Sequence, residues 1–354
     1  MIFSVMRSRI FFPRALAILT LTLSLAALCM ALPGANDKKP QKPQQQVKPM
    51  AGPRATALRV TWLYVAPDPT SEKVSRVQIG REMVVAEKSG PWLRVYANTD
   101  IEEMREQKDA PEFGTDNTPP PISGWMEAKG VVVETNAGGD LVLMGEAASQ
   151  ESLASDPRGP ANAAQNARLL YKRLVEMYPN SPLVPEAAWR AADIQWQLQK
   201  ADASTRPSAK ERDAYLRDQM DEDELKKIVK YYPHTRPADF ASYELIENKL
   251  CGDWQGQEKC PEKESEYYEK YAAENPDGAK TAQALYQAVY RQAVLVDMYG
   301  ADGNDKKSTD ARNHAHELAA KLKDKFPQTD SAWRAAALVY KLDEGIPVYG
   351  IDRQ

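Results

Sequence analysis

Cysteine and histidine are the side chains best suited to chemistry in this 354-residue chain, which has three of each. Cys251 and Cys260 enclose a short loop, and no histidine lies near them in the sequence. A metal site needs more ligands than two thiolates, and a redox pair favours only two intervening residues. In an exported chain, this spacing predicts a structural disulfide that contributes roughly 2–3 kcal/mol to stability.

The histidines and the acidic runs do not form a catalytic or metal-binding pattern. His314 and His316 are two residues apart and lie on different sides of a helix, whereas a zinc helix needs a spacing of four. The run Asp221–Glu224 is expected to open a helix, where negative charge is favourable. Asp302–Asp305 lacks the spacing and the final glutamate of a calcium loop.

The sequence also contains no nucleophile elbow, phosphate loop or dinucleotide fingerprint. It therefore predicts no metal, no cofactor and no enzymatic activity. A catalytic pair of carboxylates remains an alternative, because only a structure can show which carboxylates lie close together.

The charge of the chain argues against nucleic acid as a partner. The formal net charge is −4, and loss of an N-terminal segment with three arginines and no acid lowers it to about −7. Acidic and basic residues are interspersed, so no basic surface is expected to attract phosphate backbones.

Residues 1–35 have the pattern of a secretory signal. Three arginines precede an apolar stretch, and small residues follow it. These are Arg7, Arg9 and Arg14, then Ala15–Met30, then Ala31 and Ala35. The pattern predicts export to the periplasm or the extracellular space. An uncleaved anchor and lipidation at Cys29 are the alternatives, although Leu28 fits a lipidation signal poorly. Residues 36–54 are rich in Lys, Gln and Pro and predict a disordered linker.

Residues 55–133 contain short β-rich runs separated by turn residues. The runs are Ala57–Val65, Val74–Val77, Glu82–Glu87, Trp92–Tyr96 and Gly124–Val133. Several short strands with tight turns predict a small sandwich or barrel.

Two segments of this region, Gly90-Pro91-Trp92-Leu93-Arg94-Val95 and Gly124-Trp125-Met126, resemble a bacterial SH3 domain, and so does Leu63-Tyr64-Val65 upstream. The resemblance implies a small barrel that binds cell-wall peptides or peptidoglycan, with Trp92 and Trp125 lining the groove. Packing of both indoles inside the barrel is the alternative. Gly124 is expected to allow a sharp turn, with the Trp125 indole covering one end of the barrel. The chain departs from the family in a charged, proline-rich insertion at 97–121.

Residues 140–345 are rich in helix-forming residues and contain an internal repeat. An aromatic residue or Asn, followed by Pro and a turn residue, recurs at Tyr178–Ser181, Tyr232–Thr235, Asn275–Gly278 and Phe326–Thr329. Proline bars continuation of one helix, and the small polar residue caps the next. After the first and last of these turns, Ala188–Ala192 and Ala332–Ala336 have the same sequence, Ala-Trp-Arg-Ala-Ala.

This pattern resembles the tetratricopeptide repeat, especially the looser variety of envelope proteins. The resemblance implies stacked helix pairs whose concave surface takes peptides or partner helices. The four prolines are 54, 43 and 51 residues apart, against a family period of about 34. Inserted loops are therefore expected at 203–209 and 301–308, with a tail at 346–354. The candidate surface residues are Trp196, Tyr243, Tyr286, Tyr290 and Arg291.

The predicted fold class is multidomain, with an all-β SH3-like barrel followed by an all-α tetratricopeptide-like array. The predicted function is that of an exported, non-catalytic binding or scaffold protein of the cell envelope. Its expected partners are proteins or peptides, with peptidoglycan as a further ligand and membrane contact only through the N-terminal segment. One alternative is a lipoprotein accessory of outer-membrane protein assembly, which requires lipidation. Another is a wall hydrolase or its accessory.

Overall fold

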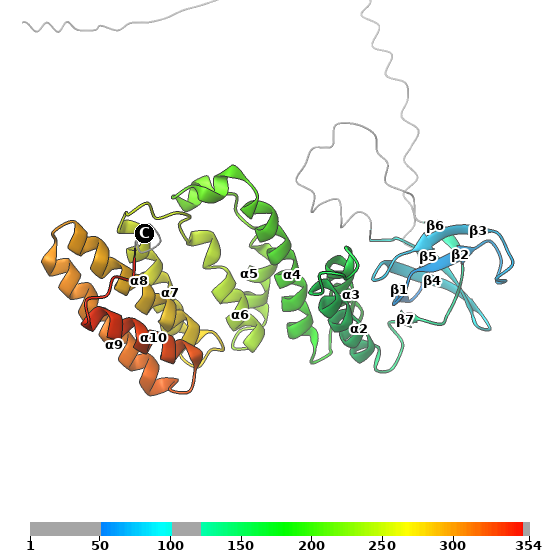
Figure 1. Ribbon diagram of the computed structural model, residues 1–354. Helices are drawn as coiled ribbons and strands as arrows, with labels where there is room; N and C mark the ends of the chain where they lie inside the picture. The colour runs from blue at the N-terminus through cyan, green and yellow to red at the C-terminus, as the bar shows by residue number, and fades with distance from the viewer. Residues whose placement is uncertain (1–50, 101–121, 350–354) are drawn as a thin grey trace, which may run out of the picture. The chain divides into compact units, whose positions relative to one another are not determined.

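The computed structural model describes residues 51–100 and 122–349, in which strands precede helices (Figure 1). The predicted signal at 1–35, most of the linker and most of the inserted loop at 97–121 lie outside the described residues. Within the described ranges, no helix is both long and apolar enough to cross a membrane.

Seven antiparallel strands form one sheet in the order β3-β2-β6-β5-β4-β1-β7. In chain order they are β1 (Arg54–Ala57), β2 (Thr61–Tyr64), β3 (Lys73–Val77), β4 (Glu82–Ser89), β5 (Trp92–Ala97), β6 (Ile122–Glu127) and β7 (Val131–Val133). The first and last of the five predicted runs are each divided in two. The reason is a pair of turns that meet, where the Leu58 N–H donates to the carbonyl of Gly130, which adopts a φ of 83°.

One face of the sheet forms its apolar core, with Leu63, Leu93 and Met126 among the buried side chains. Gly124 lies inside β6, and a Cβ added there would be 2.9 Å from the Cβ of Leu63 on β2. The predicted sharp turn at Gly124 is therefore wrong. This glycine allows two neighbouring strands to approach closely.

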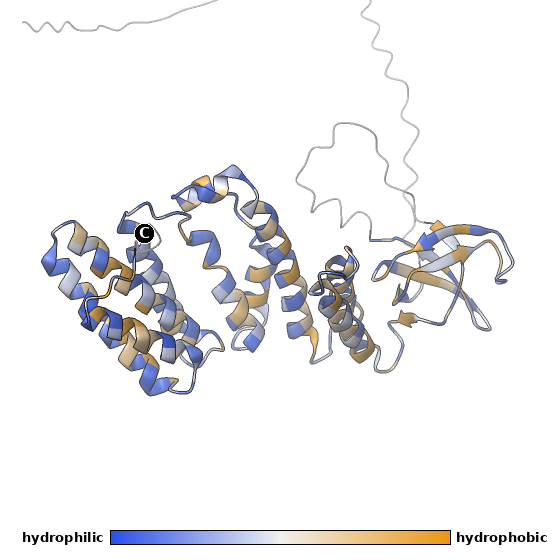
Figure 2. Cartoon of the chain, viewed as in Figure 1, coloured by the Kyte–Doolittle hydropathy of each residue, from blue (hydrophilic) through white to orange (hydrophobic). Residues whose placement is uncertain are grey.

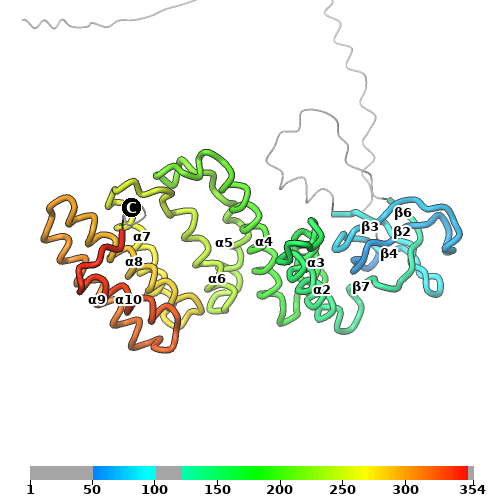
Figure 3. The backbone as a smooth tube through the Cα atoms, in the orientation of Figure 1, coloured from blue at the N-terminus to red at the C-terminus, as the bar shows by residue number. Residues whose placement is uncertain are grey.

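Nine α-helices follow within the described part of the chain. They are α2 (Gly139–Ala154), α3 (Ala163–Met177), α4 (Val184–Ser204), α5 (Asp223–Tyr231), α6 (Arg236–Glu244), α7 (Lys259–Glu274), α8 (Thr281–Ala301), α9 (Asp305–Lys325) and α10 (Asp330–Asp343). Three short 3₁₀ segments lie between them: η1 (Pro207–Lys210), η2 (Ala214–Leu216) and η3 (Glu247–Lys249). Figure 3 traces the backbone from the sheet through these helices in succession.

The four proline turns connect α3 to α4, α5 to α6, α7 to α8 and α9 to α10. Thr235 and Thr329 cap α6 and α10, because each hydroxyl accepts from a backbone N–H three residues later. The predicted loop at 301–308 is wrong in its second half. There α9 begins at Asp305, where the Asn304 side chain accepts from the Lys307 N–H.

Apolar positions recur along each helix between hydrophilic ones (Figure 2), as expected for helices that bury one stripe. Ala167, Tyr171 and Leu174 of α3 are fully buried and pack with α2 and α4. A second group joins α4 to α5 and α6 through Trp196, and a third joins α7, α8, α9 and α10.

Candidate functional site

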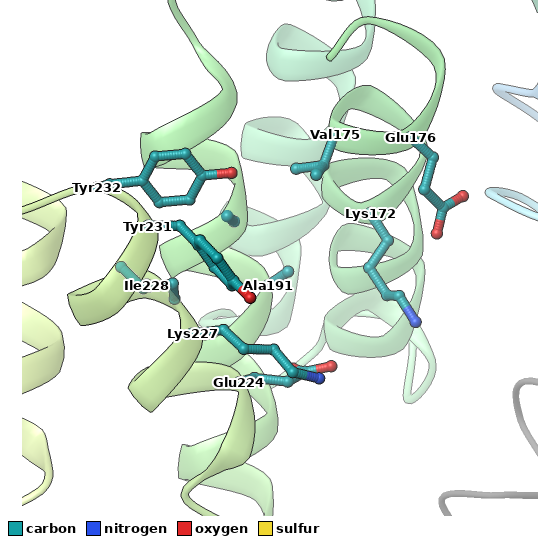
Figure 4. A pocket seen from close by; sticks show the side chains of 10 residues that line it. Lys172, Val175, Glu176, Ala191, Glu224, Lys227, Ile228, Tyr231 and Tyr232 are labelled. Atoms are coloured by element: carbon teal, nitrogen blue, oxygen red, sulfur yellow. The ribbon is translucent and has the colours of Figure 1, made fainter.

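A groove of about 480 Å³ lies between α3, α4 and α5 (Figure 4). We call it the α3–α5 groove. Its lining residues come from all three helices and combine apolar and charged side chains. They are Lys172, Val175, Glu176, Ala188, Ala191, Glu224, Lys227, Ile228, Tyr231 and Tyr232.

The apolar part of the groove follows from small residues on its central helix. Ala188 and Ala191 belong to the first Ala-Trp-Arg-Ala-Ala copy and leave space where larger side chains would fill it. Val175 of α3 and Ile228 of α5 form opposite apolar walls. A concave, mostly apolar site with a few polar groups is the usual form of a ligand site.

The two carboxylates of the groove are already neutralised by arginines. Glu224 lies 3.1 Å from the guanidinium of Arg168. Glu176 lies 2.6 Å from Arg173 and 3.0 Å from Arg54. These pairs leave little negative charge to repel an anionic ligand.

The two lysines of the groove, unlike its carboxylates, are not neutralised by an oppositely charged side chain among the described residues. Among the residues that the structure describes, neither Lys172 nor Lys227 forms an ion pair. Figure 4 shows both amino groups on the side of the groove away from Tyr232. The charged end of the groove is therefore positive, although the chain as a whole carries a formal net charge of −4.

Tyr231, the last residue of α5, adds an aromatic rim. Its side chain is 62% exposed, and the Lys230 ammonium lies 5.1 Å from the ring centre. An exposed tyrosine beside cationic groups suits contact with a ligand that is both apolar and anionic.

The predicted barrel residues Trp92 and Trp125 lie on one face of the sheet. Trp92 is buried, with 8% of its surface exposed, and meets Tyr64 edge to face, with ring centres 5.7 Å apart. The prediction that Trp92 lines an open groove is therefore wrong, because neighbouring side chains cover its indole. Trp125 is half-buried and lies opposite Tyr64 and Arg94 in the strand registers. On the same strand as Tyr64, Trp62 has Lys73 and Arg76 over its ring. This aromatic face was only partly predicted, because Trp62 was not among the expected residues.

Two of the predicted surface residues in the helical region are instead internal. Trp196 is 1% exposed, and its indole N–H donates to Glu247 at 2.9 Å. Arg291 is nearly buried and lies 3.0 Å from Glu264. The predictions that Trp196 and Arg291 line an open surface are therefore wrong, because these side chains join neighbouring helices.

The three predicted tyrosines are half-buried and do not form one site. Tyr243 contacts the rings of Tyr268 and Tyr271. Tyr290 lies beside Trp254, with ring centres 6.1 Å apart. Tyr286 has the Arg334 guanidinium 6.0 Å from its ring centre.

The structure joins Cys251 and Cys260 in a disulfide whose Cα atoms are 6.0 Å apart. The Glu264 carboxylate stabilises the loop that the disulfide closes. It accepts from the Cys251 N–H at 2.9 Å and from the Trp254 indole N–H at 3.0 Å. Neither Glu264 nor Trp254 was expected from the sequence, because nothing in the local pattern shows that they meet.

Carboxylates with altered titration lie at a different place, between α4 and α6. Burial raises the pKa of Glu244 to about 8, and the charge of Asp193 adds to this effect. Burial also raises the pKa of Asp193. Glu244 accepts from the Trp189 indole at 3.1 Å, so it has a structural contact, and neither carboxylate lines the α3–α5 groove.

No family model matches this sequence, and no curated protein matches it. A solved structure described as a DHF79 filament aligns with a TM-score of 0.17 and 12% identity, over 56% of this chain and 95% of that chain. A TM-score this low supports no conclusion about fold or function. The observations that bear on function are therefore the groove and the aromatic face of the sheet.

Proposed function

We propose that this chain is an exported, non-catalytic binding protein of the cell envelope whose helical region holds a segment of a protein partner in the α3–α5 groove. The observation that carries the proposal is the combination of an apolar groove with two lysines that have no ion pair among the described residues. Export rests on the signal pattern of residues 1–35.

The ligand that fits this groove is a peptide segment with acidic side chains next to an apolar or aromatic one. The apolar side chain would contact Val175, Ile228 and the two alanines. The acidic groups would lie near Lys172 and Lys227, where they gain charge-assisted hydrogen bonds. Attraction of opposite charges would contribute to the rate of association and to specificity.

The finer fold assignment is part of the same proposal. Four proline turns between consecutive helices and the repeated Ala-Trp-Arg-Ala-Ala sequence support a tetratricopeptide-like array. An antiparallel sheet that carries Trp92 and Trp125 on one face supports an SH3-like module. If one partner carries both ligands, binding at the first module raises the effective concentration of the second ligand at the second module.

The groove is tested by fluorescence anisotropy with short labelled peptides of three kinds: acidic with one aromatic residue, basic with the same aromatic residue, and acidic without apolar residues. The first kind should bind the purified protein best, and added salt should weaken binding, because exposed charges are screened over about 8 Å at physiological ionic strength. The double variant K172E/K227E should lower affinity by roughly tenfold or more.

The matched control is K321E/K323E, which makes the same charge change on exposed lysines of α9. It should leave the affinity unchanged, and circular dichroism should show that both variants are folded. Equal binding of the basic peptide, or equal loss in both double variants, would contradict the proposed site.

The aromatic face of the sheet supports a second ligand, a cell-wall peptide or peptidoglycan. Trp62 and Trp125 are both half-buried, so each ring is partly accessible to a ligand. The cationic groups of Lys73 and Arg76 lie over the Trp62 ring. Co-sedimentation with insoluble peptidoglycan tests it: W62A and W125A should reduce the bound fraction, whereas K172E/K227E should not. If neither tryptophan change reduced the bound fraction, the proposal that this face binds peptidoglycan would be contradicted.

A further inference from the structure

Another cavity lies beside the disulfide and shares no lining residue with the α3–α5 groove. Its volume is about 290 Å³, at the lower end of the range of about 300–1,000 Å³ that small-molecule sites occupy. The end of α4, the segment 205–222 and residues Glu247, Leu250 and Cys251 form its walls. We call it the Arg217 pocket, after the charged residue that distinguishes it.

One wall of the pocket comes from a long connection. Residues 205–222, all of which the structure describes, join α4 to α5 and contain only the short segments η1 and η2. Loops of compact domains rarely exceed about 12–15 residues unless they have a function. The Asn248 side chain fixes this connection, because it accepts from the Met220 N–H at 3.0 Å and donates to the Met220 carbonyl at 2.8 Å. A wall held in this way lowers the entropic cost of binding a ligand.

Arg217 lines the pocket with a guanidinium that has no opposite charge beside it. The side chain is half-buried, and one of its terminal nitrogens donates to the Leu250 carbonyl at 2.9 Å. Its Nε is buried and has no hydrogen-bond partner among the described residues, none of which forms an ion pair with this arginine. A partly buried charge without a counter-ion costs free energy, so a bound carboxylate would stabilise this site.

The two carboxylates that line the pocket already have other partners. Asp218 accepts from the Ser208 hydroxyl at 2.6 Å and lies 3.1 Å from the Arg206 guanidinium. Glu247 lies 2.8 Å from the Lys200 ammonium. Arg217 therefore differs from the other charged residues that line the pocket, because each of those is paired within the chain.

We propose that the Arg217 pocket binds a ligand in which a single carboxylate is attached to a short apolar group. The carboxylate accepts hydrogen bonds from the terminal nitrogens of Arg217, whose planar guanidinium matches the geometry of a carboxylate. The apolar group contacts the side chains of Met220 and Leu250 on the pocket wall.

The charge of the pocket favours one carboxylate over a phosphate. Its lining contains two cations and two carboxylates, so their formal charges cancel. An anion with more negative charge gains the same contact with Arg217 but is repelled more strongly by Asp218 and Glu247. A free small acid and the C-terminal residue of a peptide both have the required chemistry.

Calorimetric titration of the purified protein, expressed from the full sequence, tests the proposal with two pairs of probes. N-acetyl-leucine is the free acid, and a short peptide that ends in leucine has the same group at its C-terminus. Each acid is compared with its amide, which has a similar shape without the charge. At least one acid should bind, and its amide should bind roughly tenfold more weakly or worse, because a hydrogen bond to a charged group is lost. The acid that binds more tightly identifies the source of the ligand, and inorganic phosphate should bind more weakly than it does.

Variants of the protein locate the site. R217M should lower the affinity by roughly tenfold or more, whereas R217K should retain part of it, because lysine keeps the charge but not the planar fork. The matched control R158M makes the same change at an exposed arginine between α2 and α3 and should bind as the wild type does. K172E/K227E should also leave the affinity unchanged, which separates this pocket from the α3–α5 groove. Circular dichroism should show that the variants are folded.

Three results would each overturn the proposal. The first is a wild type that binds neither acid at concentrations up to about 10 mM. The second is an amide, or inorganic phosphate, that binds as tightly as the better acid. The third is a folded R217M variant with wild-type affinity. The comparison of acid with amide uses only the wild type, so it decides the question even where R217M does not fold.

Discussion

Glu244 is a buried carboxyl whose proton is held by its surroundings. Burial raises its pKa from 4.5 to about 8, and nearby Asp193, whose own pKa is raised by burial, disfavours a second negative charge. The Trp189 indole opposes this shift, since it donates to the same carboxyl. Glu244 is therefore neutral in the folded protein at a pH where it would be ionised in the unfolded chain.

This difference makes stability dependent on pH. Between about pH 4.5 and about pH 8 the folded state binds the proton and the unfolded state does not, so the free energy of unfolding falls as the pH rises. The loss is about 1.4 kcal/mol for each unit of pKa shift. In E244Q the amide can still accept from Trp189, so we expect greater stability than wild type at pH 9 and a flatter pH dependence.

Urea unfolding at pH 5, 7 and 9 measures this effect. The control E274Q changes an exposed glutamate at the end of α7. Its free energy of unfolding should depend on pH as that of the wild type does. A wild type whose stability does not fall between pH 5 and pH 8, or an E244Q variant with the same slope, would show that this carboxyl is not protonated in the fold.

Glu264 is the second residue whose removal should have a large effect. It is almost fully buried and accepts from Cys251, Trp254 and Arg291. E264A leaves the Arg291 guanidinium, which is itself nearly buried, without this partner, and loss of one member of a buried pair costs about 3–5 kcal/mol. The double variant E264L/R291M removes both charges and should lose less than E264A, as chemical denaturation with the disulfide intact can measure. A double variant less stable than E264A would contradict this interpretation.

At the level of elements, two of the four proline turns carry the cap that the sequence predicts. The Thr329 hydroxyl accepts from the Ala332 N–H at 3.2 Å, and the Thr235 hydroxyl accepts from the Ala238 N–H at 3.3 Å. We expect T329A to lower the free energy of unfolding by about 1 kcal/mol, and T329S to lower it by much less because serine caps equally well. An equal loss in both variants would indicate that the methyl group, rather than the hydroxyl, stabilises the start of α10.

The helices and their turns could be predicted because their signals are local. Proline at positions such as Pro179 and Pro327 ends a helix wherever the rest of the chain goes. The division of the outer strand runs could not be predicted, since it depends on a hydrogen bond between Leu58 and Gly130, far apart in the sequence. The α3–α5 groove was missed for the same reason. Lys172 and Lys227 lie on different helices, and only packing shows that they share a groove.

The same limit explains the errors among the predicted site residues. An aromatic residue at helical spacing gives the same sequence signal whether it is buried or exposed. Trp196 therefore could not be distinguished in the sequence from Trp333, although the first is 1% and the second 59% exposed. The difference is set by whether another helix covers the residue.

At the scale of the whole molecule, the described strands and helices belong to one compact unit. Arg173 of α3 forms a buried polar link between them. Its buried guanidinium lies 3.4 Å from Asp100, at the end of the segment after β5, and 3.7 Å from Glu82 of β4. Asp100 also lies 2.8 Å from Arg81, so charges of both signs from the sheet surround one side chain of the helical region. The apolar part of this contact is Val132 of β7, which packs against Leu143 and Leu170.

The link predicts how the molecule unfolds. R173M leaves the carboxylates of Asp100 and Glu82 with one cationic partner fewer, and removal of one member of a buried ionic group costs about 3–5 kcal/mol. Because the apolar contact remains, we expect the sheet to lose its protection before the helices rather than the whole chain to unfold at once. Hydrogen exchange should then be faster than wild type in β1, β4 and β5 and nearly unchanged in α7 to α10. R94M, which removes a half-exposed arginine of β5, should change neither region. Uniform acceleration of exchange in R173M would mean instead that sheet and helices unfold as one cooperative unit, with Arg173 contributing to both alike.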